Sequence, residues 1–282
     1  MNPRATALRA GWSRGLIELR QSVTNSGDIL NHLLWPVLML VVLYFVRDVS
    51  FQDTGFDLGA LVLPSILGMN SAMAMVTMSQ LLTAEREDGT LLRAKATPNG
   101  MLGYLTGKVV FVSFGLVLDL AIFLIPGLFL VPGISVGSAG AWLTMFWVLT
   151  LGLLATLPIG AVLGSLFASA RSQGLIMLPM MAMIATSGIF YPVTSMPDWV
   201  QWFAQVFPVY WLGLGMRSAL LPDSAAAVEI GESWRHLETV GVLGAWAVIG
   251  LALAPVVLRR MARRESGSSV AERREKALQR IG

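Results

Sequence analysis

The sequence predicts an all-α integral membrane protein with six transmembrane helices, an N-terminal amphipathic interfacial helix and short outer-leaflet helices before the last span. Hydrophobic residues make up 55% of the 282 residues and charged residues only 13%, whereas ordinary soluble domains carry about 25% charged residues. A spanning helix needs about 20 mostly apolar residues. The segments that qualify are Ile29–Val46, Leu58–Leu82, Val109–Val131, Trp142–Ala168, Leu175–Tyr191 and Thr239–Leu258.

The segment before these spans, residues 1–28, is expected to hold an interfacial helix. Its apolar residues recur at helical spacing while most of its arginines lie elsewhere around the helix. A solvated basic tail is the alternative. The apolar residues are Leu8, Trp12, Leu16 and Leu19.

The six-span domain covers residues 29–258, and basic residues indicate its orientation. Of the 20 lysines and arginines, only Arg47, Arg217 and Arg235 fall on the side opposite to the two termini. By the positive-inside rule both termini are cytoplasmic, as in a multi-pass protein of the inner (plasma) membrane. The basic tail, residues 259–282, would anchor the last helix to anionic lipid. The net charge of +3 therefore reflects topology, and we expect no nucleic-acid partner.

Each of the first five predicted spans contains one proline. Neighbouring helices can satisfy the carbonyl groups that a proline leaves free, so we expect kinks and not breaks. These residues are Pro36, Pro64, Pro126, Pro158 and Pro179.

The cytoplasmic loop 83–108 begins with a dense charge cluster between two apolar segments. It must face water, and it is too short to form a domain, so we expect it to dock onto a separate soluble protein. Gly89 would permit a tight turn there. A solvated loop without a partner is the alternative. The candidate coupling residues are Glu85, Arg86, Glu87, Asp88, Gly89 and Thr90.

The outer-leaflet segment, residues 192–238, and the residues just before it alternate prolines with large aromatic side chains. Such a segment is too hydrophobic for a free loop and too interrupted for a straight span. It would form either a gate or an aromatic belt that anchors the fold at the membrane surface. The gate candidates are Phe190, Tyr191, Trp199, Trp202 and Phe203.

The sequence contains few groups for chemistry. His32 and His236 fall on opposite membrane faces and cannot share a metal, and the absence of cysteine excludes thiolate sites and disulfides. Gly107-Lys108 lacks the rest of a phosphate loop. We therefore expect no metal, nucleotide or other cofactor on this chain, and no enzymatic activity of its own.

Two features within the spans are candidates for function. Asp119 is the only ionisable residue deep in a predicted span, where a charge costs ~2.5–3.5 kcal/mol. It is either a pathway residue or a hydrogen-bonded structural residue. Gly160 and Gly164 form a small-xxx-small stripe, which predicts a dimer packing surface.

The chain resembles permease subunits of ATP-binding-cassette (ABC) exporters, in the type-2 membrane family that includes daunorubicin-resistance permeases. The motifs are Glu85-Arg86-Glu87-Asp88-Gly89-Thr90-Leu91 with Ala96-Thr97-Pro98 and Gly107-Lys108, and Gly188-Ile189-Phe190-Tyr191-Pro192 with Met196-Pro197, Trp199 and Pro208. The resemblance implies that the charged loop forms a coupling helix on an ATPase subunit, which binds ATP and Mg. It also implies a second, identical or different, permease subunit. Leu92 departs from the acidic residue expected there.

These observations predict an ATP-driven permease that exports a hydrophobic or amphipathic compound such as a drug, an antibiotic or a lipid. A polysaccharide or lipid-linked glycan permease is the closest alternative. A proton-coupled secondary carrier would instead depend on Asp119 and need no ATPase. An intramembrane enzyme would need a paired acid, a serine–histidine pair or a metal cluster, none of which the sequence indicates.

Overall fold

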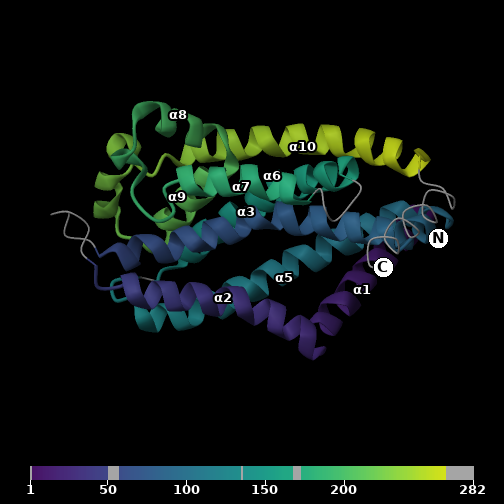
Figure 1. Cartoon of the computed structure of the whole chain (residues 1–282), viewed down its shortest axis with the longest axis horizontal. Coiled ribbons are helices and arrows are strands. Elements are labelled where there is room, and N and C mark those ends of the chain that lie inside the picture. The colour runs from purple at the N-terminus through teal and green to yellow at the C-terminus, as the bar shows by residue number, and fades with distance from the viewer. Residues whose placement is uncertain (1, 50–56, 135, 168–172, 265–282) are drawn as a thin grey trace, which may run out of the picture.

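The computed structural model describes residues 2–49, 57–134, 136–167 and 173–264, and this part forms helices without strands. The helices run in an elongated bundle, in which α1 begins and α10 ends at the same end, opposite to α8 (Figure 1). The α-helices are α1 (Pro3–Ser22), α2 (Ser26–Val46), α3 (Leu58–Glu87), α4 (Thr90–Lys95), α5 (Gly100–Leu130), α6 (Ala139–Leu166), α7 (Gln173–Thr186), α8 (Asp198–Val206), α9 (Pro208–Leu220) and α10 (His236–Arg264). Three short 3₁₀ helices are η2 (Val193–Ser195), η3 (Asp223–Val228) and η4 (Ile230–Glu232).

Five helices of the described part, α2, α3, α5, α6 and α10, are long and apolar enough to cross a membrane. They coincide with five of the six predicted spans. The remaining one, Leu175–Tyr191, overlaps α7, whose 14 residues reach about 21 Å at 1.5 Å per residue. The chain turns soon afterwards at Gly188, where φ is +70°, a value that side chains disfavour. The six-span count therefore stays a prediction. Ala168 and the tail beyond Arg264 lie outside the described residues.

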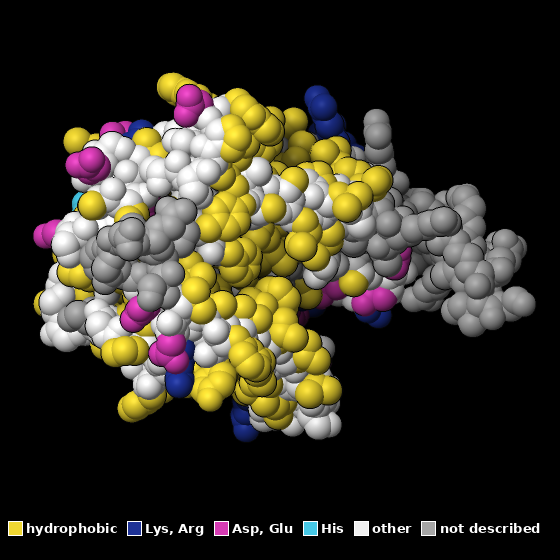
Figure 2. Space-filling view, turned by 60° about the vertical axis from the view of Figure 1, so that its left-hand side comes forward, with side chains coloured by type: hydrophobic (Ala, Val, Ile, Leu, Met, Phe, Trp, Pro, Cys, Tyr) yellow, Lys and Arg dark blue, Asp and Glu magenta, His cyan; other side chains and the backbone are white. Residues whose placement is uncertain are grey.

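Each of the five prolines named above lies inside a helix that continues past it. The expectation that these prolines do not break their helices is confirmed. Hydrophobic side chains cover much of the middle of the molecule, and charged side chains are concentrated toward its ends (Figure 2). This distribution is typical of a protein surrounded by lipid at mid-height.

The central helix of the bundle is α3, which packs against α5 on one side, α6 on the other and α9 toward the end where α8 lies. Its contact with α6 is close. A Cβ at Gly160 would lie 2.3 Å from the Met75 carbonyl oxygen, and one at Gly164 would lie 2.7 Å from that of Ser79. The prediction that Gly160 and Gly164 pack against a second permease is therefore wrong, because α3 of the same chain already occupies their surface.

A second close contact joins α1 to the first half of α5. A Cβ at Gly11 would lie 2.3 Å from the Gly103 carbonyl oxygen, and one at Gly15 would lie 2.6 Å from that of Gly107. Glycines on both helices allow this approach. The apolar residues on the other side of α1 remain exposed, as an interfacial helix requires; they include Leu8, Trp12 and Leu16.

The topology can be tested with single cysteines, because the chain has none of its own. We expect Pro222→Cys, at the end of the bundle that holds α8 and α9, to react with a membrane-impermeant maleimide added to intact cells. Asn99→Cys, between α4 and α5 at the opposite end, should react only after the membrane is permeabilised. Protection of Pro222→Cys in intact cells with labelling of Asn99→Cys would reverse the predicted orientation.

Candidate functional site

The predicted coupling loop consists of the end of α3, a turn and the short helix α4. Gly89 has φ of +81°, so the tight turn expected at this glycine is present. The Asp88 carboxylate accepts a hydrogen bond from the Thr90 amide at 2.7 Å, which starts α4. A side chain at position 89 would be strained in this conformation.

Two predicted coupling residues point into the bundle instead of toward a partner. Glu85 lies 2.5 Å from Lys108 Nζ. Arg86 is 8% exposed, and its Nη1 donates to the Ser165 carbonyl at 2.9 Å, near the end of α6. Because α3 continues to Glu87, both residues still lie on a packed helix. The expectation that Glu85 and Arg86 form a docking surface is corrected: they hold α3 to α5 and α6.

The solvent-facing charges of this region lie farther along the chain. Asp88, Arg93 and Lys95 are exposed, whereas Glu87 and Thr90 are half-buried. Arg93 Nη2 donates to the Thr90 hydroxyl at 2.9 Å. Arg93 and Lys95 were not among the predicted sites. Arg93 lies two residues after buried Leu91, a spacing that places the two side chains on different faces of a helix.

Lys108 connects three helices at the same end of the bundle. Its side chain is 3% exposed, and its Nζ lies 2.6 Å from Glu18 of α1 and 2.5 Å from Glu85 of α3. Glu18 also accepts a hydrogen bond from Arg14 Nε at 2.8 Å. Burial raises the pKa of Glu18, but the hydrogen bonds from Lys108 and Arg14 outweigh it and hold the pKa below its ordinary value. The positions of these residues in the sequence do not indicate this cluster.

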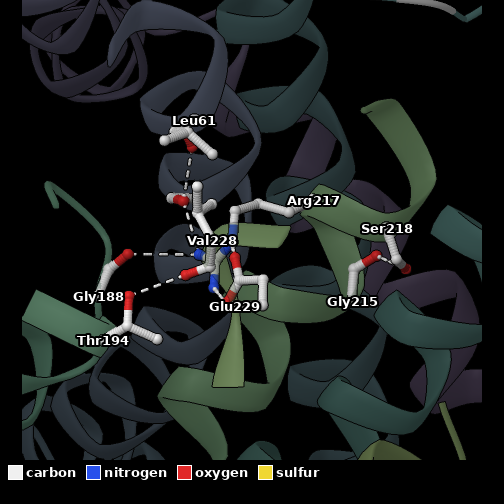
Figure 3. A network of polar contacts seen from close by, with 9 residues as sticks. Leu61, Gly188, Thr194, Gly215, Arg217, Ser218, Val228 and Glu229 are labelled. Atoms are coloured by element: carbon white, nitrogen blue, oxygen red, sulfur yellow. Dashed lines mark hydrogen bonds and ion pairs between the residues drawn. The ribbon is translucent and has the colours of Figure 1, made fainter. Parts of the chain in front are cut away.

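A second ionic cluster lies at the opposite end of the bundle, where α9 is (Figure 1), and Figure 3 shows it from close by. Arg217 and Glu229 are 2% and 4% exposed, and Arg217 donates from Nε at 2.6 Å and from Nη2 at 3.2 Å to the two carboxylate oxygens. Arg217 Nη1 also donates to the Ser65 hydroxyl at 2.8 Å and to the Gly188 carbonyl at 3.4 Å. The pair therefore joins α9 to α3, to the turn after α7 and to the segment between η3 and η4.

The predicted gate residues do not form one group. Phe190 lies beside a cavity, and the Tyr191 hydroxyl donates to the Ala185 carbonyl. The aromatic side chains of α8 lie on its outward face; they are Trp199, Trp202 and Phe203. A role of these residues in gating stays a prediction.

The cavity beside Phe190 has a volume of about 540 Å³ and lies between α2, α3, α5 and α7. Its size is in the range of small-molecule sites. Most of its lining is apolar. Methionines contribute from both sides, and they are Met69, Met73, Met177, Met180 and Met181.

Asp119 lies at this cavity and has a partner that is distant in the sequence. Its Oδ1 is 2.5 Å from His32 Nδ1, and His32 Nε2 is 3.2 Å from the Ser22 hydroxyl. Ser22 ends α1 and His32 lies in the second turn of α2. The contact with His32 fits the alternative of a hydrogen-bonded structural residue, and a role of Asp119 in the transport pathway stays a prediction.

Residues 49–255 match a family model described as ABC-2 family transporter protein. The match covers most of the chain and includes α4, Lys108, Asp119 and the Arg217–Glu229 pair, whereas Glu18 and His32 precede it. No curated protein matches the chain.

Proposed function

Because the chain belongs to the ABC-2 family of transporter proteins, we propose that it is the permease subunit of an ATP-driven exporter for a small amphipathic molecule. In this family the membrane chain is the transport subunit and associates with a separate ABC ATPase. ATP and Mg would bind to that partner, and the permease would lie in the inner membrane with both termini cytoplasmic. The cavity between α2, α3, α5 and α7 is the observation that carries this proposal.

The dimensions and lining of the cavity support a small cargo. Its volume of about 540 Å³ suits a drug-sized ligand, whereas a glycan chain would need a long open groove. Methionine side chains are flexible and polarisable, so they adapt to apolar ligands of different shape. The exporter would therefore accept compounds that share an apolar body.

A second permease subunit would complete the pathway. Because α3 packs against Gly160 and Gly164, the contact between the two permease subunits needs another surface. The exposed apolar face of α2, which includes Leu34 and Phe45, is the surface we propose for it, with lipid covering the remaining apolar faces.

The proposal is tested by reconstitution with the partner. The chain should co-purify from its native membrane with a soluble ABC ATPase, and vesicles that contain both should move an apolar dye only when ATP is hydrolysed. An ATPase variant that binds but does not hydrolyse ATP is the control. Transport by the permease alone, driven by a proton gradient, would contradict the proposal and favour a secondary carrier.

Docking of the ATPase is expected to depend on the exposed charges of α4. Arg93→Glu combined with Lys95→Glu should weaken association with the ATPase about tenfold or more, because the surface would present the wrong charge to its partner. Association is measured with purified components, and ATP-driven export is measured in vesicles. Reversal of Glu85 would be a poorer test, since it would disturb Lys108.

The matched control is Arg9→Glu combined with Arg20→Glu, which reverses two exposed charges on α1. This control should retain association. Normal association of the α4 variant would show that the ATPase docks elsewhere.

A further inference from the structure

A second cavity of about 440 Å³ adjoins the methionine-lined cavity. We call it the vestibule; it is lined by residues of α1, α2, α3 and α5 that include Glu18, Asp28, Glu85 and Lys108. The two cavities share His32 and Phe111 in their linings. A molecule that enters the vestibule therefore meets His32 before it reaches the methionines.

The route through these cavities is acidic. The vestibule is lined by three carboxylates, from Glu18, Asp28 and Glu85, and by the ammonium group of Lys108; Arg14, outside the lining, pairs with Glu18 at 2.8 Å, so the carboxylates outnumber the cations by one. Lys108 is itself in contact with Glu18 and Glu85. Beyond His32, the cavity is lined by Asp119 and by no lysine or arginine of the described part of the chain. Such a surface attracts cations and disfavours anions.

The methionine-lined cavity also holds a buried donor without a partner. Asn70 is 8% exposed, and its Oδ1 accepts a hydrogen bond from Trp35 Nε1 at 3.1 Å. An indole nitrogen can only donate, so this bond fixes the orientation of the amide. Asn70 Nδ2 then has no hydrogen-bond partner among the described residues. A buried donor in a cavity wall is a group that a ligand oxygen would satisfy.

We propose that the cargo of this permease is a lipophilic cation, with a positive centre, an apolar body and a hydrogen-bond acceptor. This inference rests on the proposed export function and specifies its substrate class. The cation passes the vestibule and takes the place of His32 beside Asp119. Its apolar body then lies against the methionines, whose flexible side chains adapt to its shape, and near the aromatic ring of Phe111, whose face attracts a cation. Asn70 donates to the acceptor.

The test compares two ions of nearly equal size and opposite charge, tetraphenylphosphonium and tetraphenylborate. Binding is measured on the purified full-length chain in lipid nanodiscs, with empty nanodiscs subtracted to remove partitioning into lipid. We expect the phosphonium ion to bind at least about tenfold more tightly than the borate ion. Equal binding of the two ions, or tighter binding of the borate ion, would overturn the proposal.

Two variants separate the charge of Asp119 from its structural role. Asp119→Asn should weaken phosphonium binding about tenfold, while Asp198→Asn on exposed α8 should leave it unchanged. His32→Gln removes the competing partner of Asp119 and should retain or raise the phosphonium affinity. If Asp119→Asn and His32→Gln weaken binding equally, the pair only supports the fold and the proposal is wrong.

These measurements use neither ATP nor the ATPase, so they can fail independently of the proposed function. If binding did not depend on charge but a neutral dye were transported at the expense of ATP, the proposal of a cationic cargo would be wrong and the proposed export function would stand. If the chain bound the phosphonium ion selectively but associated with no ATPase, the proposed cation site would stand and the proposed export function would be wrong.

Discussion

Glu229→Ala is expected to lower the free energy of unfolding by about 3–5 kcal/mol, as removal of one partner from a buried ion pair does. Arg217 is 2% exposed in the native chain, and among the described residues its guanidinium group would keep its hydrogen bonds to Ser65 and Gly188 alone. The positive charge would then lack a counterion in a low-dielectric surrounding. Because this pair joins α9 to α3 and to the turn after α7, we expect that end of the bundle to loosen first.

Thermal unfolding of the purified chain and its amount in the membrane measure this effect. Glu232→Ala, at an exposed glutamate nearby, is the control and should be almost neutral. Replacement of both partners, with Arg217→Met and Glu229→Leu, should recover much of the loss because no charge then stays buried. If Glu229→Ala unfolds at the temperature of the control, the pair does not stabilise the fold.

Lys108→Met should destabilise the chain by a comparable amount, about 3–5 kcal/mol, and should abolish ATP-driven export. The change leaves Glu18 and Glu85 close to each other without the ammonium group that now lies within 2.6 Å of each. Their repulsion would separate α1 from the end of α3. The variant would thereby disturb the end of α3 that leads into α4, where we propose that the ATPase docks.

Backbone hydrogen exchange in α1 distinguishes this outcome from general unfolding. Exchange should increase in α1 more than in α10, and adding Glu85→Gln to Lys108→Met should reverse part of the change, since only one carboxylate stays ionised. Arg20→Met, at an exposed position of α1, is the control. Unchanged exchange in Lys108→Met would contradict the role assigned to this lysine.

The sequence alone predicted most of the fold, because long apolar segments identify themselves without knowledge of their neighbours. Prediction from the sequence failed for the contacts that depend on which two helices pack together. The stripe formed by Gly160 and Gly164 was correctly identified as a close-packing surface, but spacing does not reveal whether the partner is another chain or α3. The glycines that join α1 to α5 have the same four-residue spacing and were overlooked.

The functional residues were harder to predict for a related reason. Glu85 and Arg86 belong to a charge cluster, and composition cannot distinguish the buried face of a helix from its exposed face. Asp119 fell in the middle of an apolar segment, which does not show what the carboxylate contacts. Its pairing with His32 joins residues 87 positions apart, which a local pattern does not reveal. Gly89 was predicted correctly, since a tight turn is a local property.

The short length of α7 has a consequence for the lipid around the protein. At about 21 Å, this helix is shorter than a hydrocarbon layer of about 30 Å, and a bilayer accommodates such a mismatch by thinning locally. We therefore expect the lipid beside α7 to be compressed, while the lipid beside α10, whose 29 residues exceed the layer, keeps its full depth. A molecule leaving the methionine-lined cavity past α7 would then cross less hydrocarbon than one leaving on the opposite side of the bundle.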